Sequence, residues 1–421
     1  MLLNYLKIAW RVLLRRKFFT FISLFGISFT LMVLLVVFAL FDHLTGAHMP
    51  EKRMDRMLFV SSLRQEMQDN QGWMNSPMSV RFIDTYVRTM KTPERVALTS
   101  SVGNATAFAN NKLMPLDIRY TDGEFWNIME FDFLDGRAFT ASEVKQSQPV
   151  CVVNEATARA YFGTAVGVVG KIIEIDLKRF RVAGVVPNVS AAHIYSYSDV
   201  WVPYTLSRNV FSDNRLSGDF IPVLLAPSAA KVDEMYAEYN QVISRVEIPN
   251  PKEVMKIYSW ADPVLASFTR QLFFDSTTKT GASGLEKFYL IVSVLGLLFM
   301  LLPTLNLVNL NVTRILERSS EIGVRKAFGA SSRTLVGQFL VENVVLACLG
   351  GALGLLMAAA TLALLNDLHV VAYAQFNLSG RVFGYGLLLT LFFGLLSGVY
   401  PAWKMSRLNP AVALHGNADR N

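Results

Sequence analysis

The sequence predicts an α-helical membrane protein with four spans and a large α+β domain between spans one and two. Four apolar runs lack a charged side chain: residues 18–41, 288–313, 343–366 and 382–403. At 1.5 Å per residue, each run is long enough for a hydrocarbon core of roughly 30 Å. The 246 residues of 42–287, between the first two runs, have the mixed composition of a globular domain.

Composition and charge support a membrane protein. Charged residues make up 17% of the chain and hydrophobic residues 52%, whereas about 25% charged residues is usual for soluble proteins. The net charge of +7 could suggest nucleic acid, but the basic residues concentrate in short loops beside the apolar runs, as in cytoplasmic loops. We therefore expect no nucleic-acid partner. Cys151 and Cys348 lie in different environments, so no disulfide framework is expected.

The N-terminal segment predicts a cytoplasmic amphipathic helix followed by an uncleaved first span. Residues 1–17 place leucines on one side and Lys7, Arg11 and Arg15 on the other, the pattern of an interfacial helix. The alternative is a basic flank of the first span. The apolar run 18–41 is too long for a signal peptide, whose apolar region has about 7–15 residues.

The domain at 42–287 predicts a mixed α+β fold. Strand-like runs occur at 150–154, 171–176 and 180–186, and amphipathic helices fit residues 79–90, 155–162 and 231–246. Short strands and short helices in this order favour an α+β domain. A domain of this length can bury its own core.

The later spans carry residues with expected packing roles. Pro303 and Asn306 in the second span, 288–313, are costly in hydrocarbon and predict a kink or an interhelical hydrogen bond. Two small-residue motifs predict close helix packing. They are Gly350-x-x-x-Gly354 in the third span, 338–366, and Gly394-x-x-x-Gly398 in the fourth, 381–403.

Basic residues in the short loops predict the orientation. The N-terminal segment and the central loop, 314–337, each hold five Lys or Arg, the tail, 404–421, holds three, and the loop 367–380 holds none. By the positive-inside rule, both termini and the central loop are cytoplasmic. The domain at 42–287 and the short loop 367–380 then lie outside the cytoplasm, and the family resemblance described below makes this compartment the periplasm.

The sequence contains no recognisable catalytic, cofactor-binding or metal-binding motif. His43, His48 and His193 lack metal-ligand spacing, and neither a GxSxG elbow nor a GxxxxGK[ST] phosphate loop is present. The spans lack mid-membrane acids, since Glu342 lies near a boundary. We therefore expect a mechanical or binding role, powered from another chain, rather than an enzyme or a self-powered transporter.

The central loop reads RILERSSEIGVRKAFGASSRTLVG. Glu317, Glu321 and Arg325 lie on successive helical turns, and Ile322 and Phe328 contribute an apolar stripe. A surface helix with mixed charges and an exposed aromatic ring can dock in a groove of a soluble protein. The alternative is a solvated connector between two spans, and the spacing leaves both interpretations open.

Several motifs resemble the FtsX-like/MacB-type permease family of type VII (mechanotransmission) ABC transporters. ERSSEIGVRKAFGAS and QFLVENVVLACLGGALG resemble the cytoplasmic loop and third helix of that family, and GLLSGVYPAWKMSRLNPAVAL resembles its fourth helix. DGEFWNIMEFDFLDGRAFTASE, VCVVNEATARAYFG, VGKIIEI and FRVAGVVPNV resemble the MacB-type periplasmic core domain. The motifs cover nearly the whole chain in the family's order.

The resemblance implies a coupling helix in the central loop that docks into an ATPase subunit. The exporters of this family that fuse their ATPase place it ahead of the first span. Only 17 residues precede residue 18 here, so a separate ATPase subunit, which binds ATP and Mg²⁺, is implied. The implied coupling residues are Glu317, Arg318, Glu321, Ile322, Gly323, Arg325, Lys326, Phe328, Gly329 and Ala330.

The resemblance also implies partners and a function. The expected partners are a second permease, identical or homologous, the lipids of the bacterial inner membrane, and a membrane-fusion adaptor with an outer-membrane channel. The leading hypothesis is ATP-driven efflux of a periplasmic substrate such as an antibiotic or a peptide. The alternatives are lipoprotein extraction of the LolC/LolE type, FtsX-like regulation, for which the outer domain is too large, and a membrane-anchored periplasmic enzyme.

Overall fold

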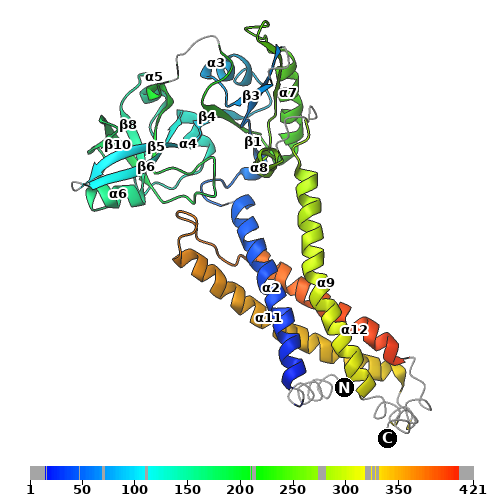
Figure 1. Ribbon diagram of the computed structural model, residues 1–421. Coiled ribbons are helices and arrows are strands. Elements are labelled where there is room, and N and C mark those ends of the chain that lie inside the picture. The colour runs from blue at the N-terminus through cyan, green and yellow to red at the C-terminus, as the bar shows by residue number, and fades with distance from the viewer. Residues whose placement is uncertain are drawn as a thin grey trace. The chain divides into compact units, whose positions relative to one another are not determined.

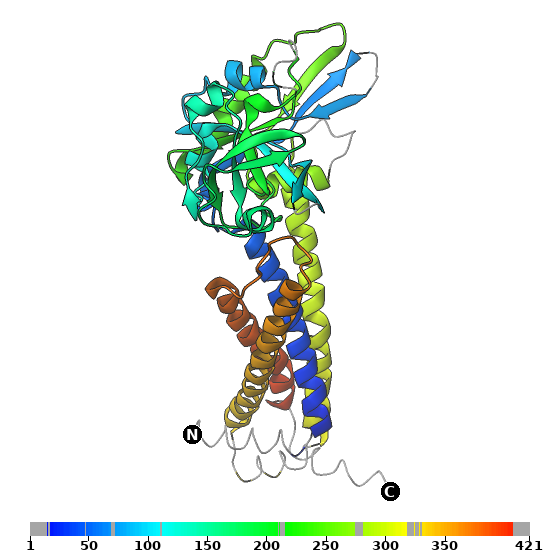
Figure 2. The ribbon, with the colours of Figure 1, turned by 90° about the vertical axis from the view of Figure 1, so that its left-hand side faces the viewer.

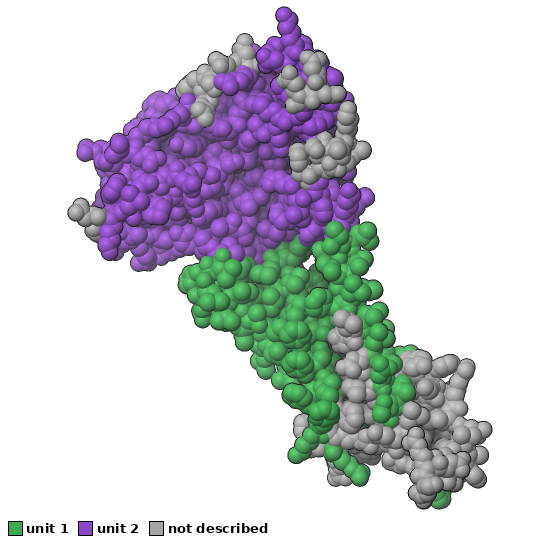
Figure 3. All heavy atoms as spheres, in the orientation of Figure 1, with its two compact units in different colours: residues 1–42, 289–370, 376–421 green, residues 43–288, 371–375 purple. Residues whose placement is uncertain are grey.

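The chain folds into two compact units, which Figure 3 colours separately. The sheet unit comprises residues 43–288 and 371–375, and the helix unit comprises residues 1–42, 289–370 and 376–421. The computed structural model describes residues 15, 17–46, 48–68, 72–109, 112–208, 210, 215–273, 281–317, 324, 328 and 331–406. Most of the helix predicted for residues 1–17 and most of the tail 404–421 lie outside these residues.

Long helices make up the helix unit (Figures 1 and 2): α2 (Lys17–Thr45), α9 (Leu285–Glu317), α11 (Ser332–Asp367) and α12 (Gly380–Ser406). Within the described residues, two stretches are long and apolar enough to cross a membrane, Thr20–Thr45 and Leu340–Asp367. A shorter apolar stretch covers Gly380–Leu396. The four-span arrangement therefore stays a prediction.

Helix α9 is continuous through residue 303. The side chains of Pro303 and Asn306 lie outside the described ones, so the kink expected at this position stays a prediction. At the other end of the unit, Asn366 joins the end of α11 to Phe376, four residues before α12. Its Nδ2 donates to the Phe376 carbonyl at 3.0 Å, and its Oδ1 accepts from the Phe376 N–H at 2.8 Å.

A ten-stranded sheet forms the main part of the sheet unit, in the order β1-β12-β4-β6-β11-β8-β10-β9-β5, with β7 paired to β10. Since β5 also pairs with β6, the six strands from β6 to β5 close into a ring. The bounds are β1 (Met57–Phe59), β4 (Arg95–Ser100), β5 (Gly103–Ala109), β6 (Lys112–Thr121), β7 (Asp135–Gly136), β8 (Val150–Asn154), β9 (Ile172–Ile175), β10 (Lys178–Val186), β11 (Val200–Pro203) and β12 (Phe220–Leu225).

The closed ring has an apolar interior. Small and β-branched side chains such as Ala107, Ile118, Val153 and Val182 are buried in one cluster. Their alternation along each strand places one face inward, as ring closure requires. A second, three-stranded sheet has the order β13-β2-β3. Its bounds are β2 (Leu63–Met67), β3 (Trp73–Ser76) and β13 (Val254–Ser259).

Helices cover the main sheet, and several match the sequence prediction. Helix α6 (Glu155–Phe162) has the predicted bounds, because the Asn154 side chain caps its first turn and Gly163, at φ 78°, ends it. The strand predicted at 150–154 is confirmed by β8. The remaining helices are α3 (Val80–Phe82), α4 (Gly123–Ile128), α5 (Ala141–Lys145), α7 (Val232–Ser244) and α8 (Val264–Leu272).

One predicted helix differs in type. Residues 79–90 form α3 and then a π-helical turn, Ile83–Val87, instead of one α-helix. The Arg88 N–H donates to the Ile83 carbonyl at 2.9 Å, which is an i→i+5 bond. Arg88 Nη2 also donates to Asp122 Oδ2 at 2.6 Å, and the two residues are 34 positions apart in the sequence. This long-range ion pair is invisible to the local periodicity on which the prediction depended.

Candidate functional site

The loop at 314–337, predicted to be cytoplasmic and to form the coupling helix, is described only in part. Helix α9 ends at Glu317 and α11 begins at Ser332, and between them Val324, Phe328 and Ser331 are described. The Phe328 N–H donates to the Val324 carbonyl at 3.0 Å, the spacing of one helical turn. Phe328 is 88% exposed. The other predicted coupling residues lie outside the described residues: Arg318, Glu321, Ile322, Gly323, Arg325, Lys326, Gly329 and Ala330.

A side-chain cap fixes where this loop ends. Ser331 Oγ accepts from the Thr334 N–H at 3.2 Å and lies 2.8 Å from Thr334 Oγ1. Such a cap satisfies one of the free N–H groups at a helix start. The loop therefore enters α11 at a defined residue.

The two predicted glycine motifs lie at close helix contacts within the chain. A Cβ on Gly350 would lie 2.7 Å from Ile27 Cγ2 of α2, and one on Gly354 would lie 2.9 Å from the Ser28 carbonyl oxygen. Both distances are below those of ordinary Cβ contacts, so the approach of α2 to α11 depends on the missing side chains.

The motif in α12 lies against α11. A Cβ on Gly394 would lie 3.0 Å from the Ala347 Cβ, and one on Gly398 would lie 3.0 Å from Leu340 Cδ2. These contacts are slightly looser than those at Gly350. The structure thus brings each glycine pair to a neighbouring helix of the same chain. Whether these positions also pack against another subunit stays a prediction.

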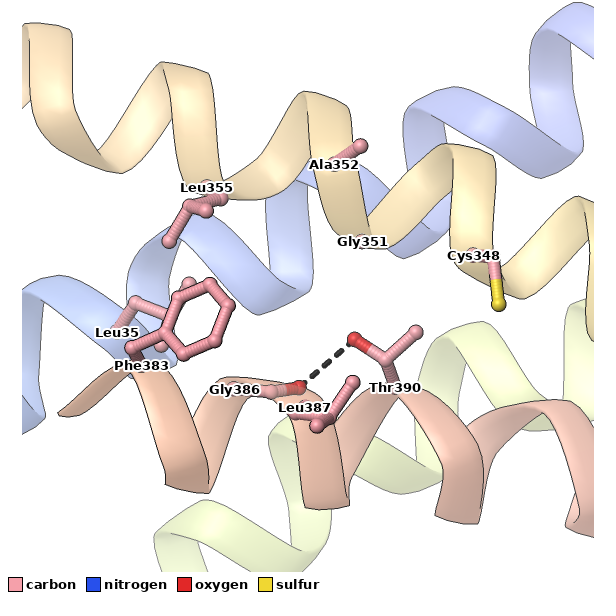
Figure 4. A pocket seen from close by; sticks show the side chains of 9 residues that line it. All are labelled: Leu35, Cys348, Gly351, Ala352, Leu355, Phe383, Gly386, Leu387 and Thr390. Carbon is pink, nitrogen blue, oxygen red and sulfur yellow. Dashed lines mark hydrogen bonds between the residues drawn. The ribbon is translucent and has the colours of Figure 1, made fainter. Parts of the chain in front are cut away.

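An apolar cavity of about 220 Å³ lies between α2, α11 and α12. Figure 4 shows Leu35 and Phe383 at one end of it and Thr390 at the other. The Thr390 hydroxyl donates to the Gly386 carbonyl at 2.7 Å. Its proton is thus already used inside the helix, and the cavity offers little polar recognition.

A buried polar cluster in the sheet unit contains a serine, a histidine and a glutamate. His193 Nδ1 lies 2.9 Å from Glu51 Oε2, and Ser196 Oγ donates to Glu51 Oε1 at 2.7 Å. Serine and histidine therefore bind the same carboxylate instead of each other, unlike a nucleophile and its base. Sequence reasoning considered His193 only as a metal ligand, and it missed Glu51 and Ser196. No motif signals this cluster, because 142 positions separate Glu51 from His193.

The described residues of the chain include no group of three or more His, Cys, Asp or Glu side chains arranged to hold a metal ion. Several titratable groups nevertheless have shifted pKa values, which is common at active sites. Burial lowers the pKa of Arg119 to about 10. Burial also raises the pKa of Asp122 to about 6, against the opposing effect of Arg88.

Hydrogen bonds show that these shifted groups have structural roles. The Asp122 carboxylate caps α4 by accepting from the Phe125 N–H at 2.9 Å. Glu143 has its pKa lowered to about 2, chiefly by the hydrogen bond from Arg137, and it completes a capping box with Thr140. Helix ends and a buried guanidinium thus account for the shifts without a reaction.

Two family models match the chain. The FtsX-like permease C-terminal model matches residues 293–410. The MacB-like periplasmic core domain model matches residues 20–241, which is more than half of the chain. The chain belongs to the FtsX/MacB-type family of ABC transporter permeases. Such a permease is a membrane protein with a periplasmic domain, so the resemblance inferred from the sequence motifs is confirmed.

Individual relatives show the same relationship to this permease. The macrolide export ATP-binding/permease protein MacB of Bdellovibrio bacteriovorus is 29% identical over 284 residues, which cover 66% of this chain and 40% of that protein. The MacB protein of Burkholderia thailandensis is 28% identical over 297 residues, covering 69% and 41%. The permease therefore matches about two fifths of the length of these relatives.

Solved structures also resemble the permease. The periplasmic region of MacB from Actinobacillus actinomycetemcomitans has 15% identity and a TM-score of 0.35, covering 53% of this chain and 94% of that one. The extracellular domain of the transporter YknZ from Gram-positive bacteria has 17% identity and a TM-score of 0.34, covering 44% and 91%.

Proposed function

We propose that this permease is a four-span subunit of the bacterial inner membrane, with both termini and residues 314–337 in the cytoplasm and the sheet unit in the periplasm. Among the described residues, α2 and α11 contain the two stretches that are long and apolar enough to cross a membrane. Around α9, leucines such as Leu290 and Leu297 are 65% and 58% exposed. Apolar side chains at that density favour a lipid or protein environment over water.

The permease transmits ATP-driven movement instead of carrying out chemistry itself. ATP and Mg²⁺ bind to a separate ATPase subunit, and the loop between α9 and α11 docks on that subunit. The observation that carries this proposal is the exposure of Phe328. This residue is 88% exposed, and it lies in a loop rich in Glu, Arg and Lys. Exposed aromatic and arginine side chains are the usual anchors of protein interfaces.

The driven process is efflux of a periplasmic substrate. Relatives of the chain are named macrolide export proteins, which favours an antibiotic or a molecule of similar size. A second permease, identical or homologous, completes the membrane part. A membrane-fusion adaptor and an outer-membrane channel would carry the substrate onward.

The apolar cavity of about 220 Å³ favours one second candidate, the extraction of lipoproteins, because its apolar lining suits an acyl chain. The two functions differ in what ATP releases. Spheroplasts that release a lipoprotein only with the intact permease would support extraction. Macrolide accumulation in permease-deleted cells, without lipoprotein retention, would support efflux.

The docking role is tested by purifying the permease from its host through an affinity tag. We expect an ATPase to co-purify, and we expect Glu321→Lys or Arg325→Glu to lower its permease-stimulated activity at least tenfold. Arg95→Glu is the control, because Arg95 forms a half-exposed ion pair with Glu124 in the sheet unit. If both loop variants retained the ATPase and its full stimulation, the docking assignment would be wrong. If no ATPase co-purified with the unmodified chain, the proposed function itself would be wrong.

A further inference from the structure

One irregular loop contacts two of the segments that connect the sheet unit to the helix unit, and it is linked to the third, the segment before α9, through helix α8. It comprises residues 187–199, between β10 and β11, and is called the junction loop below. The chain passes between the two units after residue 42, after residue 288, and on both sides of 371–375. The junction loop binds side chains or backbone near each of these points, and all the contacts lie inside the sheet unit.

The first contact is with the segment that follows α2. Glu51, six residues beyond Thr45 at the end of α2, accepts hydrogen bonds from Ser196 and pairs with His193. The Glu51 residue is 1% exposed. A buried carboxylate is costly to leave unpaired. The junction loop and the segment after α2 are therefore expected to move together.

The second contact reaches the segment that precedes α9 through helix α8. Tyr195 Oη lies 2.6 Å from Ser267 Oγ on α8. Helix α8 in turn holds the start of α9, because Arg270 Nη1 donates to the Gly281 carbonyl at 3.1 Å and to the Ala282 carbonyl at 3.3 Å. Leu285, the first residue of α9, follows three positions later.

The third contact is with residues 371–375, between α11 and α12. The Ala191 N–H donates to the Ala372 carbonyl at 2.9 Å, and Tyr373 Oη donates to Asp199 Oδ1 at 3.0 Å. Tyr373 has a φ of 56°, a left-handed conformation that is unfavourable for a residue with a side chain. The contacts with the junction loop hold it in that conformation.

On its other side, the junction loop is bonded to the closed sheet through Arg119 of β6. The Arg119 guanidinium donates to the carbonyls of Tyr197 and Ile194, each at 2.8 Å, and to Thr99 Oγ1 of β4 at 3.2 Å. Arg119 is fully buried. Because a buried guanidinium cannot exchange these acceptors for water, a displacement of the loop requires a displacement of β4 or β6.

We propose that the junction loop is where movement of the membrane helices enters the sheet unit, with Tyr195 and Tyr373 as its positioning residues. The inference rests on the proposed function, in which ATP drives those helices. It adds a location to that function. The three helix-connected segments converge on one loop, and the loop is bonded to the sheet that would bind or displace the substrate.

The test compares two double variants of the full chain, each purified with its ATPase and reconstituted in nanodiscs. Tyr195→Phe with Tyr373→Phe removes two junction hydrogen bonds and keeps both rings. Tyr239→Phe with Tyr258→Phe is the matched control. Tyr239 Oη lies 2.7 Å from Ser259 Oγ, and Tyr258 Oη donates to Glu66 Oε2 at 3.2 Å, both outside the loop.

Hydrogen–deuterium exchange is measured without nucleotide and with Mg²⁺-ATP and orthovanadate. In the unmodified complex we expect the exchange of residues 187–199 and of β4 and β6 to change with nucleotide. In the junction variant we expect that response to fall at least roughly tenfold, because two hydrogen bonds are lost from the equilibrium. ATP hydrolysis and the control variant should keep their unmodified values. Tyr373→Phe alone gives the same comparison if the double variant does not fold.

The possible failures are distinguishable. If β4 and β6 responded to nucleotide equally in the junction variant and the control, the inference would be overturned and the proposed function would stand. The same holds if the sheet unit responded while residues 187–199 did not. If no residue of 43–288 responded in the unmodified, ATP-hydrolysing complex, both the proposed function and the inference would be wrong.

Discussion

The sheet unit and the helix unit are stabilised in different ways. In the sheet unit, large side chains such as Phe125 and Trp201 are fully buried, and the buried Arg119 guanidinium is hydrogen-bonded to the Tyr197 carbonyl. In the helix unit, α9 leaves Phe299 46% exposed, and the buried cluster of Ile27, Leu31 and Leu346 is small. The sheet unit thus carries its own core, whereas the helix unit leaves many large apolar side chains exposed, which favours a lipid or protein environment over water.

The largest test of this contrast removes one phenyl ring from each unit. Phe125→Ala should lower the free energy of unfolding of the sheet unit by about 3–5 kcal/mol, because the ring is 0% exposed. Phe299→Ala in α9 should change the free energy of unfolding of the helix unit by less than about 0.5 kcal/mol. Thermal unfolding of the detergent-solubilised chain, followed by tryptophan fluorescence, measures both. Equal losses would show that the two units do not differ in packing.

A smaller effect tests the close approach of helices within the helix unit. Gly350→Leu should destabilise the contact between α2 and α11 by about 1–3 kcal/mol, because its Cβ would lie 2.7 Å from Ile27. Gly296→Leu in α9 is the matched control, since a Cβ there meets nothing within 4 Å. Denaturation by sodium dodecyl sulfate, followed by circular dichroism, compares them. If Gly296→Leu lost as much stability as Gly350→Leu, the loss would reflect helix propensity and not the packing of α2 against α11.

The smallest effect tests whether acid acts on the sheet unit alone. Glu143 has a folded-state pKa of about 2, below its ordinary value of 4.5, chiefly through the hydrogen bond from Arg137. A depressed pKa gives stability that is present above about pH 4.5 and lost as the pH falls towards about 2. Since the Arg137 side chain is 57% exposed, solvent screening reduces the contribution to about 1–2 kcal/mol.

Glu143→Gln should therefore lose this contribution at neutral pH and should approach the stability of the unmodified chain near pH 2. Glu124→Gln is the control, because Glu124 forms a half-exposed ion pair with Arg95 that is worth less than about 1 kcal/mol. Thermal unfolding across this pH range measures the difference. A penalty for Glu143→Gln that persisted at pH 2 would contradict the assigned ion pair.

Local signals predicted the elements of the sheet unit better than its interactions. The bounds of α6 are set by Asn154, which caps its start, and by Gly163, which ends it. Both residues directly flank the helix in the sequence. The closed strand ring, by contrast, depends on pairing between β5 and β9, in which Ala107 lies beside Ile175. No periodicity within either segment specifies that partner.

The two candidate sites, the loop between α9 and α11 and the junction loop, also differ in how far local sequence signals reveal them. The charged loop between α9 and α11 could be singled out because it interrupts two apolar runs, although its role stays a prediction. The junction loop has no comparable signature. Its residues act through partners such as Glu51 and Tyr373, which are 142 and 174 positions away. Only the folded chain brings these groups together.

The Asn366 side chain has a practical consequence for labelling the protein. Since it binds both backbone groups of Phe376, it ties this residue, four positions before α12, to the end of α11. Doubling the loop between these two residues costs only about 0.6 kcal/mol in closure entropy. Leu368 and Val370 are 62% and 64% exposed and precede the segment that contacts the junction loop. We therefore expect a short epitope or fluorophore tag inserted there to leave the hydrogen bonds between Asn366 and Phe376 in place.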